Sequence, residues 1–154
     1  MKTNIATDSL QSQRLLRCGV SADTADMSYD SGALSLMDYD SAVHERDSRR
    51  ENYEVTPAWS LGALLSNVLP KHLDDFPFTQ WIQPFGDGEI CEMEDNDECV
   101  LNGDVTLSCG ENAWVVDYDW DDFTGVLPNS DSPIEACVRA IELLSANGYK
   151  FNEQ

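Results

Sequence analysis

The sequence predicts an α+β fold: a small antiparallel sheet of about three strands flanked by an N-side and a C-terminal helix, with a largely flexible N-terminal segment. Three observations predict it. Apolar residues recur at helical spacing near both ends of residues 55–154, three short strand-like runs lie between them, and residues 1–54 are rich in Ser, Asp and Arg. We therefore expect a mostly flexible segment over 1–54, with one possible short helix, and a compact acidic domain over 55–154.

The first element that we expect is a short helix near the N-terminus. Asp8 and Gln11 have the spacing of a helix cap, and Gly19 is placed as its C-terminal stop. Residues 24–29 are expected to dock as an extended piece. A cluster of basic residues follows in the segment expected to be flexible, and it could fold back on the acidic region; its members are Arg46, Arg49 and Arg50.

The next elements are a helix and an aromatic loop. Leucines and a valine at helical spacing predict a helix over about 58–69, which ends before Pro70. Residues 71–84 carry several aromatic residues between prolines, and we expect a loop whose aromatic side chains fill the core. Residues 85–88 have the composition of a turn.

Strands are expected at 89–93, 105–109 and 113–120, joined by glycine-containing turns. The third is the clearest, because side chains alternate across a strand. Its two faces would be apolar and acidic: Trp114, Val116, Tyr118 and Trp120 on one, and Val115, Asp117, Asp119 and Asp121 on the other.

The last element is a helix that begins with the capping sequence Ser132-Pro133-Ile134-Glu135. Glu135 and Arg139 are spaced as an ion pair on one helical face. Asn147-Gly148 predicts a left-handed C-terminal turn. The expected apolar stripe consists of Ile134, Cys137, Val138, Ile141 and Leu144.

Short blocks along the chain resemble an uncharacterised family of small proteins encoded by phages and mobile elements of gut bacteria. The blocks are Gln13-Arg14-Leu15-Leu16, Gly19-Val20, Thr24-Ala25-Asp26-Met27, Pro57-Ala58-Trp59-Ser60-Leu61-Gly62-Ala63-Leu64-Leu65 and Asn147-Gly148-Tyr149. The resemblance implies an accessory role and carries no assigned chemistry. It does not include the acidic segment around 89–104.

The charge distribution limits the possible partners. The formal net charge is −20, and between Lys71 and Arg139 the chain has seventeen Asp and Glu residues and no Lys or Arg. Direct binding to nucleic acid or anionic lipid needs Lys and Arg, so both are disfavoured. A basic protein surface or a cation is the expected partner.

The cysteines and the N-terminus indicate the compartment. Five cysteines form an odd set without a CxxC pair, so a disulfide framework is not expected. Residues 1–4 lead into polar sequence without the apolar stretch of a signal peptide, and no apolar run approaches the ~20 residues of a membrane span. The expectation is a cytoplasmic protein with free thiols and no membrane association.

The leading functional hypothesis is a non-enzymatic accessory protein that binds a basic partner through its acidic face, in a sharper version as a nucleic-acid mimic. Trp120 would add stacking against arginine. The partner, the oligomeric state and any ordering of 1–54 on binding are left open. The expected partner-binding residues are Glu89, Glu92, Glu94, Asp95, Asp97, Glu98, Asp117, Asp119, Trp120, Asp121 and Asp122.

The alternative is a divalent-metal-binding domain or small enzyme that uses the carboxylates of Asp117, Asp119 and Asp121. Their spacing of about 6.6 Å along a strand would let two of them share a hard cation. The segment fails as an EF-hand, because Asp122 stands where that loop requires Gly. The cysteines lack the short spacings of a zinc site. We expect no cofactor, no metal and no catalytic residue.

Overall fold

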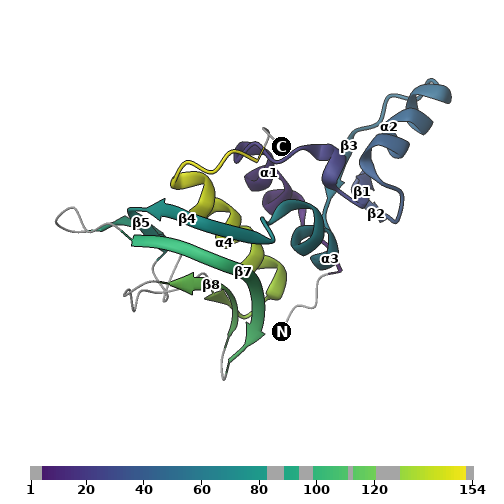
Figure 1. Ribbon diagram of the computed structural model, residues 1–154. Helices are drawn as coiled ribbons and strands as arrows, with labels where there is room; N and C mark the ends of the chain where they lie inside the picture. Colours follow the sequence, from purple (N-terminus) through teal and green to yellow (C-terminus); the bar gives the residue numbers. More distant parts are fainter. Residues whose placement is uncertain (1–4, 83–88, 94–98, 111–112, 121–128, 152–154) are drawn as a thin grey trace.

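The computed structural model describes residues 5–82, 89–93, 99–110, 113–120 and 129–151, and at positions 82, 119, 120 and 129 it describes the backbone only. The α+β class is confirmed (Figure 1). In chain order the elements are α1 (Ser9–Arg17), η1 (Ala22–Thr24), β1 (Met27–Asp30), β2 (Ala33–Ser35), α2 (Tyr39–Ser48), β3 (Val55–Ala58), α3 (Leu61–Ala63), η2 (Leu64–Val68), β4 (His72–Phe78), β5 (Gln80–Ile82), β6 (Ile90–Glu92), β7 (Cys99–Cys109), β8 (Trp114–Trp120), β9 (Asn129–Ser130) and α4 (Pro133–Ala146).

The main sheet has the antiparallel order β4-β7-β8-β9, and α4 runs along one of its faces (Figure 1). The side chains between helix and sheet form the core. Leu101 of β7 is 3% exposed, and Val116 and Tyr118 of β8 are also buried, at 2% and 5%. The strands predicted at 89–93, 105–109 and 113–120 are confirmed as β6, β7 and β8, although β7 begins earlier, at Cys99.

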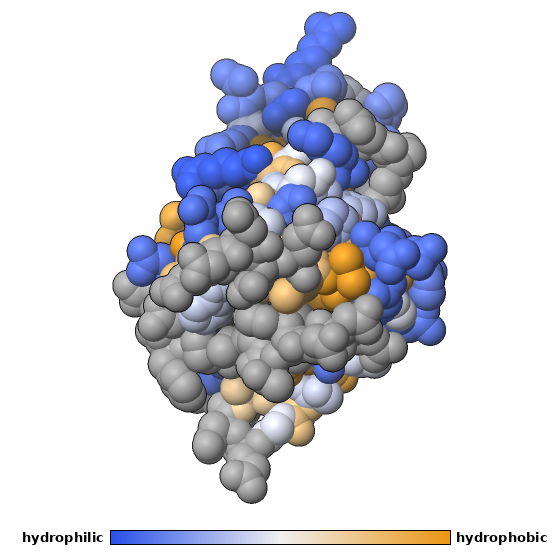
Figure 2. Space-filling view, turned by 60° about the vertical axis from the view of Figure 1, so that its left-hand side comes forward, coloured by the Kyte–Doolittle hydropathy of each residue, from blue (hydrophilic) through white to orange (hydrophobic). Residues whose placement is uncertain are grey.

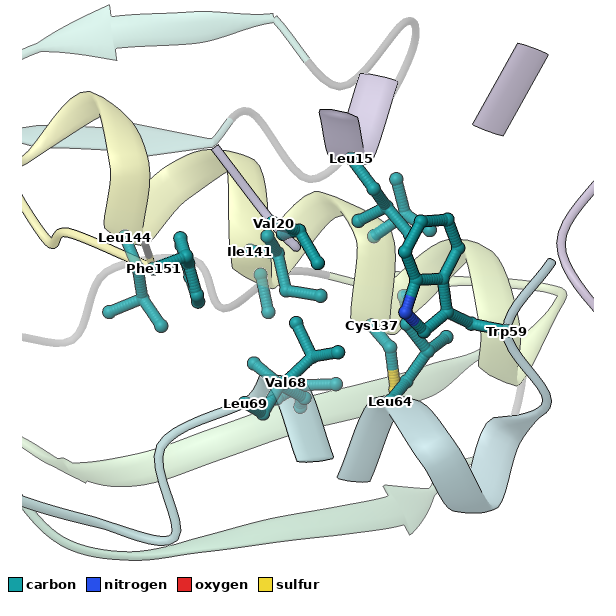
Figure 3. Packing of buried hydrophobic residues seen from close by; sticks show 14 of the residues in the cluster. Leu15, Val20, Trp59, Leu64, Val68, Leu69, Cys137, Ile141, Leu144 and Phe151 are labelled. Atoms are coloured by element: carbon teal, nitrogen blue, oxygen red, sulfur yellow. The ribbon is translucent and has the colours of Figure 1, made fainter. Parts of the chain in front are cut away.

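The C-terminal helix α4 is confirmed with its predicted cap and stripe. The Ser132 hydroxyl accepts a hydrogen bond from the Glu135 amide at 3.3 Å, and Pro133 occupies the first turn. Gly148 has φ +96°, and the Tyr149 amide donates to the Leu144 carbonyl at 2.9 Å, so the chain turns back as predicted. All five residues of the predicted stripe are at most 2% exposed: Ile134, Cys137, Val138, Ile141 and Leu144. Cys137, Ile141 and Leu144 are labelled in Figure 3.

Helix α1 is confirmed as well. Asp8 accepts from the Gln11 amide at 2.8 Å, and Gln11 accepts from the Asp8 amide at 3.0 Å, which completes a reciprocal capping box. Leu15 is fully buried and lies with the residues of α4 and η2 in the core (Figure 3). Gly19 follows the helix with φ +86°, a conformation that glycine adopts without strain.

The helix predicted over 58–69 begins later than the sequence suggested. Residues 55–58 form β3 instead, because they pair with β1 over the register Met27 to Ala58 and Asp30 to Val55. Ser60 is the helix cap, accepting from the Ala63 amide at 3.1 Å, and the helix continues as a π-helical turn to Val68. Trp59, at the junction, is fully buried (Figure 3).

The prediction of a loop over 71–84 was wrong. Residues 72–78 form β4 and residues 80–82 form β5. The prolines suggested a loop, but β4 lies at an edge of the described sheet, where Pro77 needs no donor on its outer side. A register shift between Leu73 and Phe76 accommodates Asp75 at φ +48°. Phe78 fills the core as expected and is 2% exposed.

Residues 5–54 carry regular structure along most of their length, where the sequence indicated mostly flexible chain. Strands β1, β2 and β3 form an antiparallel sheet of order β2-β1-β3, and α2 packs beside it. Because β3 starts at Val55, this sheet joins the two predicted segments, 1–54 and 55–154. The part that contains β2 and α2, here called the α2 lobe (residues 27–50), protrudes in Figure 1, and its upper end is hydrophilic in Figure 2.

The basic cluster of the α2 lobe pairs locally. Arg46 Nε lies 3.2 Å from Asp47 Oδ1, and Arg49 Nη2 lies 2.7 Å from Glu45 Oε1, one helical turn before it. We expected that this cluster could fold back on the acidic region, but these contacts are local. Glu45, Arg46 and Asp47 belong to α2, and Arg49 follows its last residue as the C-cap.

Candidate functional site

The outer face of the main sheet is polar and acidic. On β8 the side chains of Val116 and Tyr118 are buried against α4, and Asp117 lies between them in sequence and therefore points to the opposite face. Asp117 pairs with Thr106 of β7, and Asp119 pairs with Asn102. We call this surface the acidic face; it comprises His72, Asp74 and Asp75 of β4, Asn102, Asp104 and Thr106 of β7, and positions 117 and 119 of β8.

Cross-strand contacts hold the acidic face in place. Asp104 is opposite His72 in the register, and its Oδ1 lies 2.8 Å from His72 Nδ1. Both side chains are well exposed, so this pair contributes little to folding stability. Asn102 Oδ1 accepts a hydrogen bond from the Asp75 amide at 2.7 Å, which fixes the bulge of β4 against β7.

The hairpin of β5 and β6 carries two predicted site residues, Glu89 and Glu92, and both are exposed. It is attached to the end of α4 through one side chain. Asn147 Oδ1 accepts from the amides of Thr79 at 2.9 Å and Gln80 at 3.0 Å, and its Nδ2 donates to the Gln80 carbonyl at 3.0 Å. The C-terminal end of α4 thus positions the hairpin that carries Glu89 and Glu92.

The structure separates the predicted site into parts. Glu89 and Glu92 lie on the β5–β6 hairpin, whereas Asp117, Asp119 and Trp120 belong to β8, where Trp120 pairs with Leu101. Only the backbone positions of Asp119 and Trp120 are described. The remaining predicted residues lie outside the described residues: Glu94, Asp95, Asp97, Glu98, Asp121 and Asp122.

Sequence reasoning missed the acidic residues of the two neighbouring strands. Asp74 and Asp75 stood in the predicted loop, and Asp104 stood in a predicted turn. A signal was present for Asp104, because the alternation of Leu101, Gly103, Val105 and Leu107 with polar residues extends the strand through the supposed turn. For β4 the bulge breaks the alternation, so no simple pattern marks that strand.

Glu135, one of the seventeen acidic residues between Lys71 and Arg139, is largely shielded from solvent. Its carboxylate binds Arg14 at 2.5 Å and Arg139 at 3.2 Å, and Arg14 also binds Glu142. Burial alone would raise the pKa of Glu135, but the hydrogen bonds from Arg14 and Gln11 and the two positive charges outweigh it and hold that pKa below its ordinary value. This cluster joins α1 to α4 and is structural.

The potential metal ligands do not converge in the described part of the chain. Among residues 5–82, 89–93, 99–110, 113–120 and 129–151, no three His, Cys, Asp or Glu side chains form a group that could hold a metal ion. All five cysteines are free thiols. Burial raises the pKa of Cys137 to about 12, so this thiol is protonated at neutral pH and acts as a core residue.

The chain matches no protein-family model, no curated protein sequence and no solved structure. No helix in the described residues is long and apolar enough to cross a membrane. These comparisons therefore indicate no function for the candidate site, which leaves its geometry and charge as the basis for a proposal.

Proposed function

We propose that this chain is a non-enzymatic, cytoplasmic accessory protein of a phage or mobile element, and that it binds a basic surface of a partner protein through the acidic face. The origin and the accessory role follow from the resemblance of its sequence blocks. The binding mode follows from the charge and its placement. The observation that carries the proposal is that carboxylates occupy the outer face of three neighbouring strands whose inner face is packed against α4.

The acidic face is suited to electrostatic capture. The side chains of Asp74, Asp75 and Asp104 are exposed, and Asp104 forms a salt bridge with His72, which is charged only when protonated. Exposed like charges attract a basic surface over about one Debye length, ~10 Å at 0.1 M salt, and accelerate association. The charges would set the rate and orientation of docking more than the final affinity.

A sharper form of the proposal is that the acidic face mimics nucleic acid. Duplex DNA presents one charge per ~1.7 Å of axis, so a single strand row with steps of about 6.6 Å is too sparse. The acidic face has carboxylates on β4, β7 and β8, which are neighbours about 4.8 Å apart. This two-dimensional arrangement supports the mimic form better than one strand could.

The test is affinity capture from the native host with the tagged protein, at about 0.05 M and about 0.5 M salt. We expect a basic protein to be captured at low salt and lost at high salt. The variant Asp74→Asn, Asp104→Asn, Asp117→Asn should bind the captured protein more slowly. The matched control, Asp23→Asn, Asp40→Asn, Glu51→Gln, removes the same charge from exposed positions elsewhere and should bind like the original chain.

Equal loss of binding in both triple variants would show that net charge, not the acidic face, is responsible. Capture that does not change with salt would contradict the proposal. For the mimic form, duplex DNA should compete with the chain for the captured protein; simultaneous binding of both would exclude it.

A further inference from the structure

A cleft of about 300 Å³ lies between the start of α1 and the β1–β2 hairpin. Its lining includes Tyr29 and Thr56 of the small sheet, Asp8 before α1, Gly32 of the hairpin turn and Glu54 before β3. We call it the hairpin cleft. None of these residues belongs to the acidic face. Its volume is at the low end of ligand pockets, which suits one side chain of a partner better than a free cofactor.

The fold builds the floor of the cleft from one row of the small sheet. Leu34, Tyr29 and Thr56 are cross-strand partners in β2, β1 and β3, so their side chains share a face. Ser28, on the other face, is fully buried and donates its hydroxyl to the Met37 carbonyl at 2.8 Å, just before α2. Helix α2 thus covers one face of this sheet, and the cleft opens on the other.

The walls are held by local hydrogen bonds. Ser31 and Gly32 form a tight hairpin turn with φ +51° and +87°, the geometry of a type I′ turn. The Ser31 amide donates to the Glu54 carbonyl at 3.1 Å, which ties the turn to the strand that precedes β3. The Tyr29 hydroxyl donates to the Thr7 carbonyl at 2.8 Å and fixes the ring. The cleft is therefore formed before any partner binds.

Negative charge predominates in the cleft. Asp8 uses Oδ1 to cap α1, and its second oxygen makes no hydrogen bond that the structure shows. Within the described residues, neither Asp8 nor Glu54 has a salt bridge to a cation. The α1 terminus contributes about +0.5 of an elementary charge. Two carboxylates exceed it, so the cleft keeps a net charge of about −1.5.

An exposed apolar surface adjoins the cleft. Leu34, next to Tyr29 in the cross-strand row, is 40% exposed, and Leu36 is 81% exposed two residues further on. Exposed leucines beside an aromatic floor and two carboxylates suit an arginine flanked by an aliphatic residue. The guanidinium gains charge pairing with the carboxylates and a cation–π contact with Tyr29, and the aliphatic neighbour covers Leu34.

We propose that the hairpin cleft binds an arginine side chain of a partner protein, with an aliphatic residue next to it in the partner sequence resting on Leu34. This site is distinct from the acidic face and does not require that the acidic face binds anything. The two surfaces lie on different sheets and would engage different parts of a partner.

The experiment is an NMR titration of the ¹⁵N-labelled chain with a short peptide that contains one arginine beside a leucine. The comparison peptide carries citrulline, which has nearly the shape of arginine without its charge. We expect saturable shifts of the Ser31 and Gly32 amides with the arginine peptide, and at least about fivefold weaker binding of the citrulline peptide. The variant Glu54→Gln should weaken binding of the arginine peptide by a similar factor. The variant Glu51→Gln, at a nearby exposed position outside the cleft, should leave this binding unchanged.

The proposal is overturned if the two peptides bind equally, if the shifts do not saturate, or if Glu54→Gln binds like Glu51→Gln. The triple variant of the acidic face, Asp74→Asn, Asp104→Asn, Asp117→Asn, should bind the arginine peptide like the original chain. The capture experiment therefore tests the acidic-face proposal, and the peptide titration tests the cleft proposal separately. A peptide that binds only through the acidic face would lose its affinity in the triple variant, and that result also contradicts the cleft proposal.

Discussion

Helix α4 has 14 residues and helix α2 has 10, and the forces that hold the two helices differ. Helix α4 buries an entire apolar stripe against the main sheet and is joined to α1 by the Arg14–Glu135 ion pair. Helix α2 has one buried residue, Ala42, and otherwise depends on its Asp38 cap and on local ion pairs. Burial of apolar side chains therefore stabilises α4 and the main core, whereas local hydrogen bonds and ion pairs hold the α2 lobe. We expect the two regions to open with different free energies.

The largest effect is expected from Ile141→Ala in α4. Ile141 of α4 is fully buried and faces the residues of η2 (Figure 3), so truncation of its side chain leaves a cavity in the main core. The free energy of unfolding should fall by about 2–5 kcal/mol. Urea unfolding followed by tryptophan fluorescence measures it. Val43→Ala in α2, a half-buried position, is the matched truncation and should lose far less; equal losses would contradict the comparison.

The next effect concerns the ion pair that anchors α4. Glu135→Gln should lower the free energy of unfolding at pH 7 by about 1–3 kcal/mol, because the partly buried Arg14 loses a charged partner. The pKa of Glu135 is depressed in the folded state, so its contribution is complete above the ordinary pKa of glutamate and is lost as the pH falls through the folded value.

The urea midpoints of the original chain and of Glu135→Gln should therefore differ at pH 7 and converge toward pH 3. Glu92→Gln, an exposed acid on the β5–β6 hairpin, serves as the control and should leave the midpoint nearly unchanged at pH 7. A gap between the original chain and Glu135→Gln that stays constant with pH would show that the carboxylate charge is not what anchors α4.

A smaller and more local effect is expected from Asp38→Ala at the start of α2. Its Oδ1 accepts from the Ser41 amide at 2.7 Å. The hydrogen bond from the Ser41 side chain, together with this one from the amide, holds the pKa of Asp38 below its ordinary value. Hydrogen exchange of the α2 amides should accelerate severalfold, while the amides of α4 keep their protection. If α4 accelerated equally, the α2 lobe would open only together with the main core, and the two regions would form one cooperative unit.

The smallest effect is expected from Arg49→Ala. The pair with Glu45 is more than half exposed on the arginine side, so its loss should change the free energy of unfolding by no more than about 0.5 kcal/mol. Thermal unfolding of this variant beside the original chain measures the change. A loss comparable with that of Glu135→Gln would mean that surface charge stabilises the α2 lobe more than its geometry indicates.

The parts of the fold that could be predicted from the sequence are those encoded locally. The caps at Asp8 and Ser132 and the apolar stripe of α4 require only neighbouring residues, and the predicted helices match α1 and α4. Strand β3 depends on pairing with β1, which lies 25 to 31 residues away by register, so Thr56-Pro57 was read as the start of a helix. Strand β4 was hidden by Pro77 and by the bulge at Asp75.

The candidate site could be predicted in composition more than in arrangement. The alternation in β8 correctly placed Asp117 opposite the buried Val116 and Tyr118. It could not show that Asp104 and Asp75 come from two other strands onto the same face, because sheet order is set by contacts distant in sequence. The hairpin cleft was invisible for the same reason: Asp8, Tyr29 and Glu54 are separated by more than 20 residues each and meet only in the folded chain.

The edge strand β4 has a consequence for how the protein behaves when it is concentrated. An exposed edge normally offers free amides and carbonyls on which a second copy can add a strand, and this leads to fibres. In β4 the proline at 77 supplies no amide, and the bulge at Asp75 turns the neighbouring backbone out of register with any flat incoming strand. Two copies that approach at this edge therefore find no continuous ladder to extend, and their mutual repulsion keeps them apart.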